Sequence, residues 1–455
     1  MTSAEKAQDK SQLTQERLRD LADALESGAF VQVRRMLNHL PAPTIAHLLE
    51  SSPLRTREVL WKLVEKENEG DVLNYLNDSI QADILGKLSP EEVASITEGL
   101  DTDDIADLLQ NLPEQVIREV LQAMDEQDRK RLEAVLSYPE DTAGGLLNTD
   151  TITVRRSHTL DVVLRYLRRH NEIPEMTDSI LVVDRNDILL GILPLHRLLV
   201  SDPDLTVADV MTTDFEAIPV AMNQSQIAQM FERMDWISAP VVDEKGRLLG
   251  RITIDDIVDV IRAQSDHSIN RMAGLSDFED TFAPVLKTAR SRAVWLGINL
   301  VTAFLASAVI SQFSATIDQV VALAVLMTIV ASMGGVAGNQ TLTLVIRSMA
   351  LGQIGKTNSL WLMNRELAVA CLNGMLWAVV SGAAAWLWFD DLALGCIFAM
   401  AMIINLIVAA LSGAFLPLIL KSLSIDPALA GGAVLTTITD VVGFLSFLGL
   451  ATLFY

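Results

Sequence analysis

The apolar residues divide the chain into a front part with short, interrupted runs and a last part, from Trp295 onward, with long continuous ones. From Leu21 to about Leu136 the pattern is that of short amphipathic helices separated by prolines. We therefore expect a polar leader over residues 1–20 and an all-α N-terminal domain over residues 21–137. Short helices that repeat in this way favour a compact superhelical stack.

A sequence repeat follows the predicted helical domain. Residues 180–191 match residues 239–250 at a constant offset of 59 positions. Each copy contains an apolar strand, a polar turn, a second strand and a helix, which predicts two α/β modules over residues 138–201 and 202–264. The pair resembles tandem CBS modules. Residues 265–289 mix polar and apolar positions, and we expect a connecting, or plug, helix there.

The last part of the chain contains five apolar runs that are long enough to cross a lipid bilayer. They cover approximately residues 293–313, 319–346, 362–389, 392–420 and 427–455. We expect an all-α transmembrane domain of five helices over residues 290–455. The chain is thus predicted to be multidomain, with an all-α superhelical domain, tandem α/β modules, a connecting helix and a membrane domain.

Basic residues predict the orientation of these five runs. They flank one set of run ends, at Lys287, Arg290, Arg292, Arg347, Lys356, Arg365 and Lys421. The opposite loops carry Asp318, Asp390 and Asp391 and no basic residue. Because cytosolic loops are enriched in Lys and Arg, we expect the N-terminal half in the cytosol and the C-terminus outside. The first twenty residues lack an apolar run, so we expect no secretory signal.

Charge separates the same two parts of the chain. Six of the 58 acidic and four of the 35 basic residues follow residue 292. Residues 1–292 therefore carry a net charge of −21. An acidic surface of this kind repels phosphate, so we expect no nucleic-acid partner. Cys371 and Cys396 lie in apolar runs without metal-ligand spacing. The sequence contains no Walker loop, nucleophile elbow or dinucleotide fingerprint, which argues against an enzyme.

Asp440 is an acidic residue well inside the fifth apolar run. A carboxylate at the bilayer centre costs roughly 2.5 to 3.5 kcal/mol, so it should meet a cation, a partner or water. A hydrogen bond between helices is the alternative, but no basic residue lies at comparable depth in any run. One carboxylate does not balance a divalent ion, whereas two copies facing each other would. A homodimeric pore is therefore the hypothesis that we draw from this residue.

A second polar cluster lies in the second run, within residues 334–343. Asn339 and Thr343 are four positions apart and therefore share one helix face. Close helix packing explains the glycines of this cluster equally well. Amide, hydroxyl and carboxylate oxygens suit hard cations, and Mg²⁺ in particular keeps several waters while it touches one or two carboxylates. We expect Asn339 and Thr343 to line a hydrated pathway.

With the tandem modules and the five runs, two further segments carry a specific resemblance. They are Gly338-Asn-Gln340 and Asp426-Pro-Ala-Leu429, the latter followed eleven residues later by Asp440. Together these features resemble the MgtE family of Mg²⁺ transporters, from Leu21 to the end of the chain. The resemblance implies a homodimer in which Asp440 of each protomer contributes to one selective site for hydrated Mg²⁺.

The resemblance also assigns roles to residues around that selective site. It implies that Asn339 and Thr343 line the same path. It further implies that Asp426 is a carboxylate at the cytosolic entrance, where it bridges through Mg²⁺ to the connecting segment.

Feedback by cytosolic Mg²⁺ is a further implication of the resemblance. The matching acids are Asp103 and Asp107 in the N-terminal domain and Asp235 and Asp256 in the second module. Clustered carboxylates repel each other unless cations bridge them, so bound Mg²⁺ would hold the channel closed. Without the resemblance, Asp103 and Asp107 would indicate only a solvated helix start.

The sequence departs from the family pattern at the sites of feedback. Gln264, His267 and Ser268 stand in the connecting segment where carboxylates are expected, and Asn223 and Ser225 do so in the second module. These departures leave open whether sensing of Mg²⁺ is weakened, shifted in affinity or lost.

The resemblance to CBS modules raises ATP as a second ligand. Such modules often hold adenine nucleotides through a Thr or Ser and an Asp, and Thr253 and Asp256 match these positions in the second module. The first module has Pro194 and Arg197 instead, so at most one site per chain is expected. Thr and Asp at this spacing also form an ordinary helix cap, and the sequence leaves both interpretations open.

The function that we expect is import of Mg²⁺ into the cytoplasm across the inner membrane of a bacterium, by a multi-pass channel. Two alternatives stay open: a broader divalent cation transporter, for Co²⁺ or Mn²⁺, without Mg²⁺ feedback, and a membrane-anchored CBS sensor. An anion transporter is disfavoured because the only deep charge is negative. An anchor would tolerate the substitution Asp440→Asn, whereas a channel would lose flux or selectivity.

Overall fold

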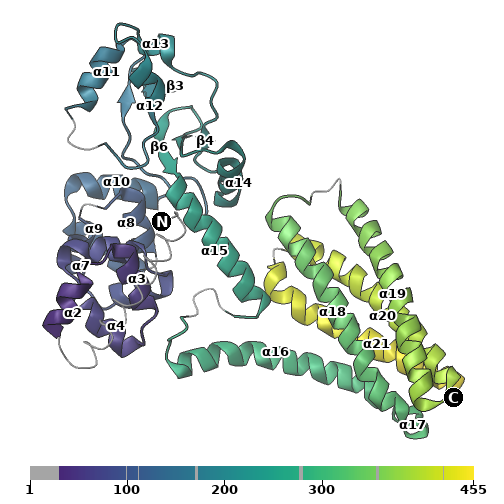
Figure 1. Cartoon of the computed structure of the whole chain (residues 1–455). Helices are drawn as coiled ribbons and strands as arrows, with labels where there is room; N and C mark the ends of the chain where they lie inside the picture. Colours follow the sequence, from purple (N-terminus) through teal and green to yellow (C-terminus); the bar gives the residue numbers. More distant parts are fainter. Residues whose placement is uncertain are drawn as a thin grey trace, which may run out of the picture. The chain divides into compact units, whose positions relative to one another are not determined.

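The structure is a computed structural model that describes residues 30–98, 100–110, 112–169, 173–275, 280–354, 358–423 and 425–455. The predicted polar leader over residues 1–20 lies outside these ranges. The chain forms two compact units (Figure 1). Unit 1 holds the described residues up to Gln264 together with residues 280–284, and unit 2 holds the described residues of 265–277 and 285–455.

Unit 1 begins with a stack of short helices, as the proline pattern predicts. They are α2 (Phe30–Leu37), α3 (Ala42–Glu50), α4 (Leu54–Trp61), the 3₁₀ turn η1 (Lys66–Asn68), α5 (Glu69–Asn74), α6 (Asp78–Leu85), α7 (Pro90–Ile96), α8 (Thr102–Gln110), α9 (Glu114–Ala123) and α10 (Glu126–Leu136). Pro41, Pro53 and Pro113 stand just before α3, α4 and α9. Because proline has no N–H to satisfy, it is well suited to a helix start. Ser89 and Glu92 form a reciprocal capping box at α7.

The two predicted α/β modules follow. The first comprises β1 (Thr153–Val154), α11 (Leu160–Leu167), β2 (Ser179–Val183), β3 (Leu189–Pro194) and α12 (Leu195–Val200), and the second comprises α13 (Val207–Val210), β4 (Ile218–Pro219), α14 (Gln224–Met234), β5 (Ser238–Val242), β6 (Leu248–Thr253) and the start of α15 (Ile254–Met272). In each sheet the first strand runs parallel to the second, which pairs antiparallel with the third. The turns match as well, because Asp187 and Gly246 both adopt a left-handed conformation, at φ 59° and 75°. The sequence repeat is confirmed.

The cores of unit 1 do not follow the predicted module boundary at residue 138. The backbone of residues 142–148 pairs with the second module, where Ala143 N donates to Met222 O at 2.8 Å and Asn148 exchanges two bonds of 2.9 Å with Arg251. The helical stack, this segment and the second module share one hydrophobic core. The first module has a separate core, formed around β2 and α11. The N-terminal domain and the second module therefore form one packed body.

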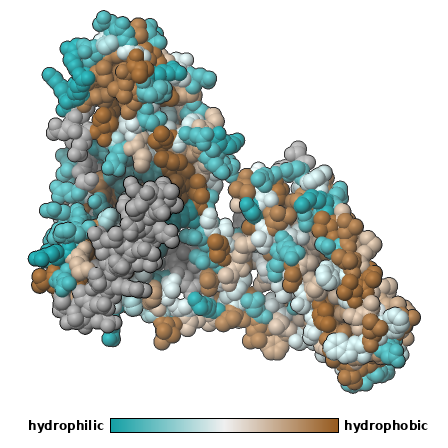
Figure 2. Space-filling view, viewed as in Figure 1, coloured by the Kyte–Doolittle hydropathy of each residue, from teal (hydrophilic) through white to brown (hydrophobic). Residues whose placement is uncertain are grey.

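Among its described residues, unit 2 contains five helices of membrane-spanning length, which confirms the prediction. They are α16 (Val285–Ser311), α18 (Ala322–Ala350), α19 (Ser359–Phe389), α20 (Leu392–Ser422) and α21 (Pro427–Phe454), with the short α17 (Ser314–Gln319) between the first two. The predicted connecting segment is divided between elements: residues 265–272 form the last turns of α15, and residues 285–289 begin α16. Figure 2 shows hydrophobic residues spread over the surface of the long helices, as expected where helices face lipid.

Small residues set the packing of the membrane helices. A Cβ atom at Gly338 would come within 3.1 Å of Leu435, and one at Gly413 within 2.7 Å of the Gly338 carbonyl. Half of the most apolar window of α20 is buried, whereas only 6% of that of α16 is. Helix α20 is thus the centre of the bundle, and α16 lies largely uncovered within a single chain.

Candidate functional site

The register between α18 and α21 fixes the depth of Asp440. Gly338 faces Leu435, Leu342 faces Gly431, and Val330 faces Gly443. These three contacts share one antiparallel register, which places Asp440 level with residue 333 of α18. At 1.5 Å per residue, Asp440 lies roughly 20 Å along the helix from the start of α21. This confirms that its carboxylate is deep within the span.

Asp440 is half-buried, and its carboxylate is not compensated within the part of the chain that the structure describes. Among those residues, no hydrogen bond or ion pair involves its side chain. The neighbouring Thr437 and Thr439 hydroxyls are already committed, since they donate to the carbonyls of Ala433 and Thr436. A carboxylate at this depth without a protein partner requires water, a cation or a second chain.

Asn339 and Thr343 both have exposed side chains on α18. By the register above they lie level with residues 434 and 430 of α21, so Asn339 is roughly 9 Å along the axis from the level of Asp440. The neighbouring Thr341 points into the bundle instead. The polar pair therefore shares one outward face, at successive depths between Asp440 and the start of α21, and one chain alone does not enclose it.

The structure identifies two buried polar residues that sequence analysis missed. Glu366 of α19 is 6% exposed and accepts hydrogen bonds from Thr341 Oγ1 at 3.2 Å and Arg365 Nη1 at 2.7 Å. Asn405 of α20 is fully buried and donates to the Val330 carbonyl at 2.8 Å. Both are polar residues inside apolar runs, and this signal could have identified them.

Asn405 explains why residue 334 of α18 is a glycine. A Cβ atom at Gly334 would come within 2.2 Å of the Asn405 amide nitrogen. Close packing therefore accounts for Gly334 and Gly338, which was one of the two interpretations of this cluster.

Asp426 does reach the connecting segment, but its partner there is a basic residue. Arg271 Nη1, in the last turn of α15, lies 2.7 Å from Asp426 Oδ2. The other carboxylate oxygen accepts from the backbone N–H of Ala428 at 2.8 Å and so caps α21. Both oxygens of this candidate ligand are thus engaged by protein donors.

In unit 1 an acidic cluster joins the start of α8 to the start of α15. We define it as Asp101, Asp103, Asp104, Asp107, Asp255, Asp256 and Asp259. Asp103 is 4% exposed, and burial together with the charge of Asp256 raises the pKa of its carboxyl well above the usual range. Burial raises the pKa of Asp104 to about 6, despite a hydrogen bond from Asn74. These shifts show that the cluster is crowded with negative charge.

Two other predicted sensing residues belong to this cluster. Burial, with repulsion from Asp255, raises the pKa of Asp256. The pKa of Asp107 is raised too, by loss of water around the carboxyl and by repulsion from Asp103, although its side chain remains in contact with solvent. Asp103, Asp107 and Asp256 therefore lie in one region of unit 1.

The fourth predicted residue lies elsewhere. Asp235 ends α14 in a left-handed conformation, φ 52°, with an exposed side chain. The carboxylates of the cluster are also spread out. Over the residues that the structure describes, no three His, Cys, Asp or Glu side chains converge tightly enough to hold a metal ion directly.

One oxygen in the cluster still lacks a hydrogen bond. The buried Oδ1 atom of Asp103 has no donor within reach among the described residues. A buried acceptor without a donor is costly, and a hydrated cation would satisfy it. The residues present thus fit Mg²⁺ bound through water and one or two carboxylates.

The residues that replace expected acids make direct hydrogen bonds. Gln264 Nε2 donates to Ser225 Oγ at 2.6 Å, and Asn223 Nδ2 donates to Asp141 Oδ2 at 3.2 Å. Asn223 also caps α14 through the backbone N–H of Ser225. Neutral side chains therefore stand at Gln264, Ser225 and Asn223, where the family resemblance predicts carboxylates, and they make direct hydrogen bonds.

At the candidate nucleotide position the helix cap is formed. Thr253 Oγ1 donates to Asp256 Oδ2 at 3.0 Å, at the start of α15. In the first module Pro194 precedes α12, and Arg197 donates to Thr212 Oγ1 at 3.1 Å. Thr253 and Asp256 thus bond to each other.

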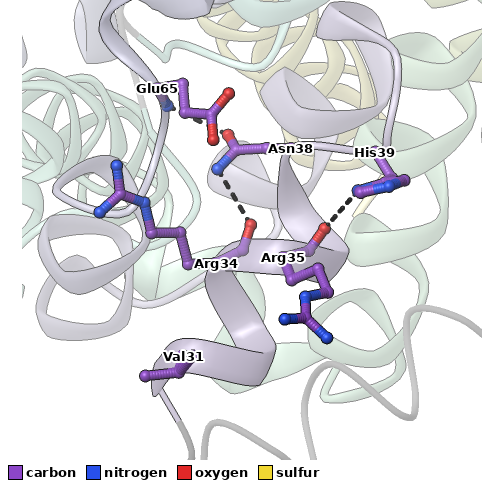
Figure 3. A pocket seen from close by; sticks show the side chains of 6 residues that line it. All are labelled: Val31, Arg34, Arg35, Asn38, His39 and Glu65. Carbon is purple, nitrogen blue, oxygen red and sulfur yellow. Dashed lines mark hydrogen bonds between the residues drawn. The ribbon is translucent and has the colours of Figure 1, made fainter.

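A hollow of about 270 Å³ on the first helices of unit 1 is unrelated to these sites (Figure 3). Its polar side chains close helix ends: Asn38 donates to the Arg34 carbonyl at 2.9 Å, and a ring nitrogen of His39 lies 2.7 Å from the Arg35 carbonyl. We assign this hollow a structural role.

Models of three protein families match the chain. A model described as a divalent cation transporter, MgtE, matches residues 327–450, and one for the MgtE intracellular N domain matches residues 40–141. The CBS domain model matches twice, over residues 143–202 and 207–263. These matches cover the helical stack, the two modules and most of the membrane helices.

Two curated relatives are similar over most of the chain. The magnesium transporter MgtE of Bacillus subtilis is 30% identical over 329 residues, which is 72% of each chain. The magnesium transporter MgtE of Thermus thermophilus is 32% identical over 327 residues, or 71% of this chain and 72% of the relative.

A solved structure is similar to the front half of the chain. It is the cytosolic domain of the Mg²⁺ channel MgtE in complex with ATP, with a TM-score of 0.50 and 34% identity. The similarity covers 53% of this chain and 99% of the solved chain.

Proposed function

The chain belongs to the MgtE family of magnesium transporters, and from that premise we propose that it conducts Mg²⁺ into the cytoplasm through a pore made by two copies. It is a multi-pass protein of the inner membrane. In this proposal the N-terminal half faces the cytoplasm and the C-terminus lies outside. The distribution of basic residues between the runs supports this orientation.

The observation that carries the proposal is the uncompensated carboxylate of Asp440. It lies deep in α21, is half-buried, and has no protein partner among the described residues. A hydrated divalent cation offers the compensation that the protein does not supply. Asn339 and Thr343, nearer the cytosolic end of α18, would hydrogen-bond to the water shell of the same ion.

A second copy of the chain would complete the path. Asn339 and Thr343 lie on an outward face, while Gly338 and Gly413 close the interior of the bundle. If two such faces met across an axis, two Asp440 carboxylates would balance the charge of one Mg²⁺ ion. The largely uncovered α16 supplies further surface for such a contact.

The acidic cluster would bind regulatory Mg²⁺. Its carboxylates repel each other, and the unsatisfied oxygen of Asp103 is a position that a hydrated cation would fill. Asp107 and Asp256 would contribute from the same region, with the distant Asp235 as a secondary position, whereas both oxygens of Asp426 are already engaged by Arg271 and Ala428. Bound Mg²⁺ would tighten the contact between α8 and α15 and so favour one conformation of unit 1.

ATP is the other regulatory ligand to test, with Thr253 and Asp256 as the contacting residues. The homologous cytosolic domain solved with ATP supports this. The bond between Thr253 and Asp256 would have to open, and the acidic cluster would repel the phosphates. We therefore expect nucleotide binding to require Mg²⁺, measured by calorimetry with and without EDTA.

Uptake of Mg²⁺ into liposomes tests the proposed function. The substitution Asp440→Asn should reduce uptake at least about tenfold, because about 1.4 kcal/mol of lost cation stabilisation already gives this factor. Asp390→Asn is a matched control, since Asp390 is exposed in the loop before α20 and its left-handed φ of 53° suits asparagine. Equal uptake by the two variants would contradict the role of Asp440.

The same assay separates the alternative functions. Absence of uptake by the unaltered chain would favour the membrane-anchored CBS sensor. Uptake of Co²⁺ or Mn²⁺ as fast as Mg²⁺ would favour a broader divalent transporter. Native mass spectrometry would test the two-copy pore, because a strictly monomeric protein is incompatible with it.

A further inference from the structure

The last turn of α15 is tied to the first residue before α21 by an ion pair within unit 2. Arg271 and Asp426 are separated by 2.7 Å, and their side chains are only 29% and 24% exposed. In Figure 1 the end of α15 lies beside the start of the yellow helix α21. Because Asp426 also caps α21, the guanidinium acts directly on the residue that begins the last membrane helix.

A second contact seats the same end of α15 on another membrane helix. Gly274, just after α15, has φ 71°, and a Cβ atom there would lie 2.0 Å from Trp295 Nε1 of α16. The backbone turn therefore packs directly against the indole ring, at a position where only glycine fits. Two of the five spanning helices thus hold the end of α15.

A direct hydrogen bond also holds α15 one step earlier along the helix. Gln264 bonds to Ser225 at 2.6 Å, without a carboxylate on either side. The C-terminal half of α15 is therefore held by bonds between protein groups, in contrast to the carboxylates at its start. No divalent ion is needed to satisfy any of these contacts.

We propose that Arg271 is a built-in cation that latches α15 to the cytosolic end of α21, so that closure of this end does not require cytosolic Mg²⁺. The inference rests on the proposed function and names a regulatory device of the same pore. A guanidinium remains protonated at all physiological pH values and cannot dissociate from the protein. The latch therefore persists when the Mg²⁺ concentration falls, unlike a bridge made by the metal.

The latch predicts low flux at low cytosolic Mg²⁺ in the unaltered, full-length chain. In membrane patches with the N-terminal half facing an EDTA solution, Arg271→Gln should raise the Mg²⁺ current about five- to tenfold. A tenfold change corresponds to about 1.4 kcal/mol, the range of a well-formed, partly buried charged hydrogen bond. Arg271→Lys keeps the charge without the planar fork and should restore part of the closure.

Charge reversal at the same position separates a latch from a merely structural contact. Arg271→Asp places two carboxylates together, so the current should be high in EDTA and fall again in millimolar Mg²⁺. Arg290→Gln is the control, because Arg290 is an exposed residue of α16 in the same unit. Arg271→Gln currents within twofold of the unaltered chain would overturn the proposal.

Hydrogen exchange distinguishes failure of the latch from failure of the proposed function. In EDTA, backbone exchange over residues 265–275 should be slow in the unaltered chain and about tenfold faster in Arg271→Gln. This readout does not depend on transport. If the unaltered chain carries no Mg²⁺ but exchange still accelerates, the transport proposal fails and the latch stands. If exchange is unchanged, the latch fails whatever the current shows.

Discussion

The negative charge around helix α15 is balanced differently at its two ends. At its start, Asp255, Asp256 and Asp259 lie near the carboxylates of α8, and burial, together with repulsion between the carboxylates, raises the pKa of several members of the cluster. At its end, Arg271 meets Asp426 at 2.7 Å and neutralises it. One end leaves negative charge for a mobile cation to balance, and the other carries the balancing charge in its own sequence.

Because of this difference, we expect the two ends of α15 to respond differently to Mg²⁺. The start of α15 should change with Mg²⁺ concentration, because its carboxylates repel in the absence of a cation. The end should respond less, because Arg271 already neutralises Asp426. Regulation in this chain would then depend on α8 and α15 of unit 1, while the contact with α21 sets a constant bias toward closure.

The largest expected effect comes from removing the charge at the acidic end. The double substitution Asp103→Asn and Asp256→Asn should make unit 1 insensitive to Mg²⁺. In the unaltered full-length chain, millimolar Mg²⁺ should slow proteolysis of unit 1 about tenfold relative to EDTA, because cations bridge the repelling carboxylates. Limited proteolysis with mass spectrometry measures this ratio.

A control for this prediction uses acids outside the cluster. Asp161→Asn and Asp202→Asn alter two acids outside the cluster, the first half-buried and the second exposed, and should leave the Mg²⁺ effect intact. If the Asp103 and Asp256 variant retains the full protection from proteolysis by Mg²⁺, the acidic end of α15 is not the end that responds to the cation.

A smaller effect is expected from pH in the absence of Mg²⁺. The folded pKa of Asp104 is about 6, above its usual value of 3.8, so folding takes up a proton between these values. The contribution to stability is fully present below pH 3.8 and is lost as the pH rises through 6. Unit 1 should therefore gain of order 1–3 kcal/mol between pH 7 and 5 in EDTA.

Thermal unfolding of unit 1 within the full chain measures this gain in stability. Asp104→Asn should remove the part of the pH dependence that this carboxyl contributes and raise the stability of unit 1 at pH 7. A stability that falls on acidification from pH 7 to 5 would contradict the expected direction of this effect.

The smallest effect is expected when acids are introduced at the Gln264–Ser225 contact of α15. Gln264→Glu with Ser225→Asp introduces acids where a neutral bond of 2.6 Å now stands. The pair should cost about 1 kcal/mol in EDTA through like-charge repulsion, and millimolar Mg²⁺ should recover it. Gln264→Ala with Ser225→Ala removes the bond without adding charge, so its cost should not respond to Mg²⁺. Denaturant titrations compare the two variants.

Local patterns predicted much of this fold. The five spans follow from the length of apolar runs, and the paired modules follow from a repeat with an offset of 59 residues. The depth of Asp440 is likewise a property of its position in a run. These features depend on neighbours in sequence, which is why a single sequence suffices to predict them.

Contacts between distant segments were beyond the sequence. Arg271 and Asp426 are 155 positions apart, and nothing near either residue indicates the other. The expectation from the family was a metal bridge at Asp426, and only the packing of the end of α15 within unit 2 revealed an arginine there. Glu366 and Thr341 meet in the same way, across two helices. Such pairs depend on helix rotation, which periodicity does not fix.

The separate core of the first module has a practical consequence for engineering. The chain enters this core near Ile152 and leaves it near Met211, just after α13, while the N-terminal helices and the rest of the second module keep a common interior without it. The first module is thus an insertion between two segments of the chain that share one hydrophobic core. Grafting a foreign ligand-binding domain between these two points would turn the transporter into a reporter that responds to a ligand of choice.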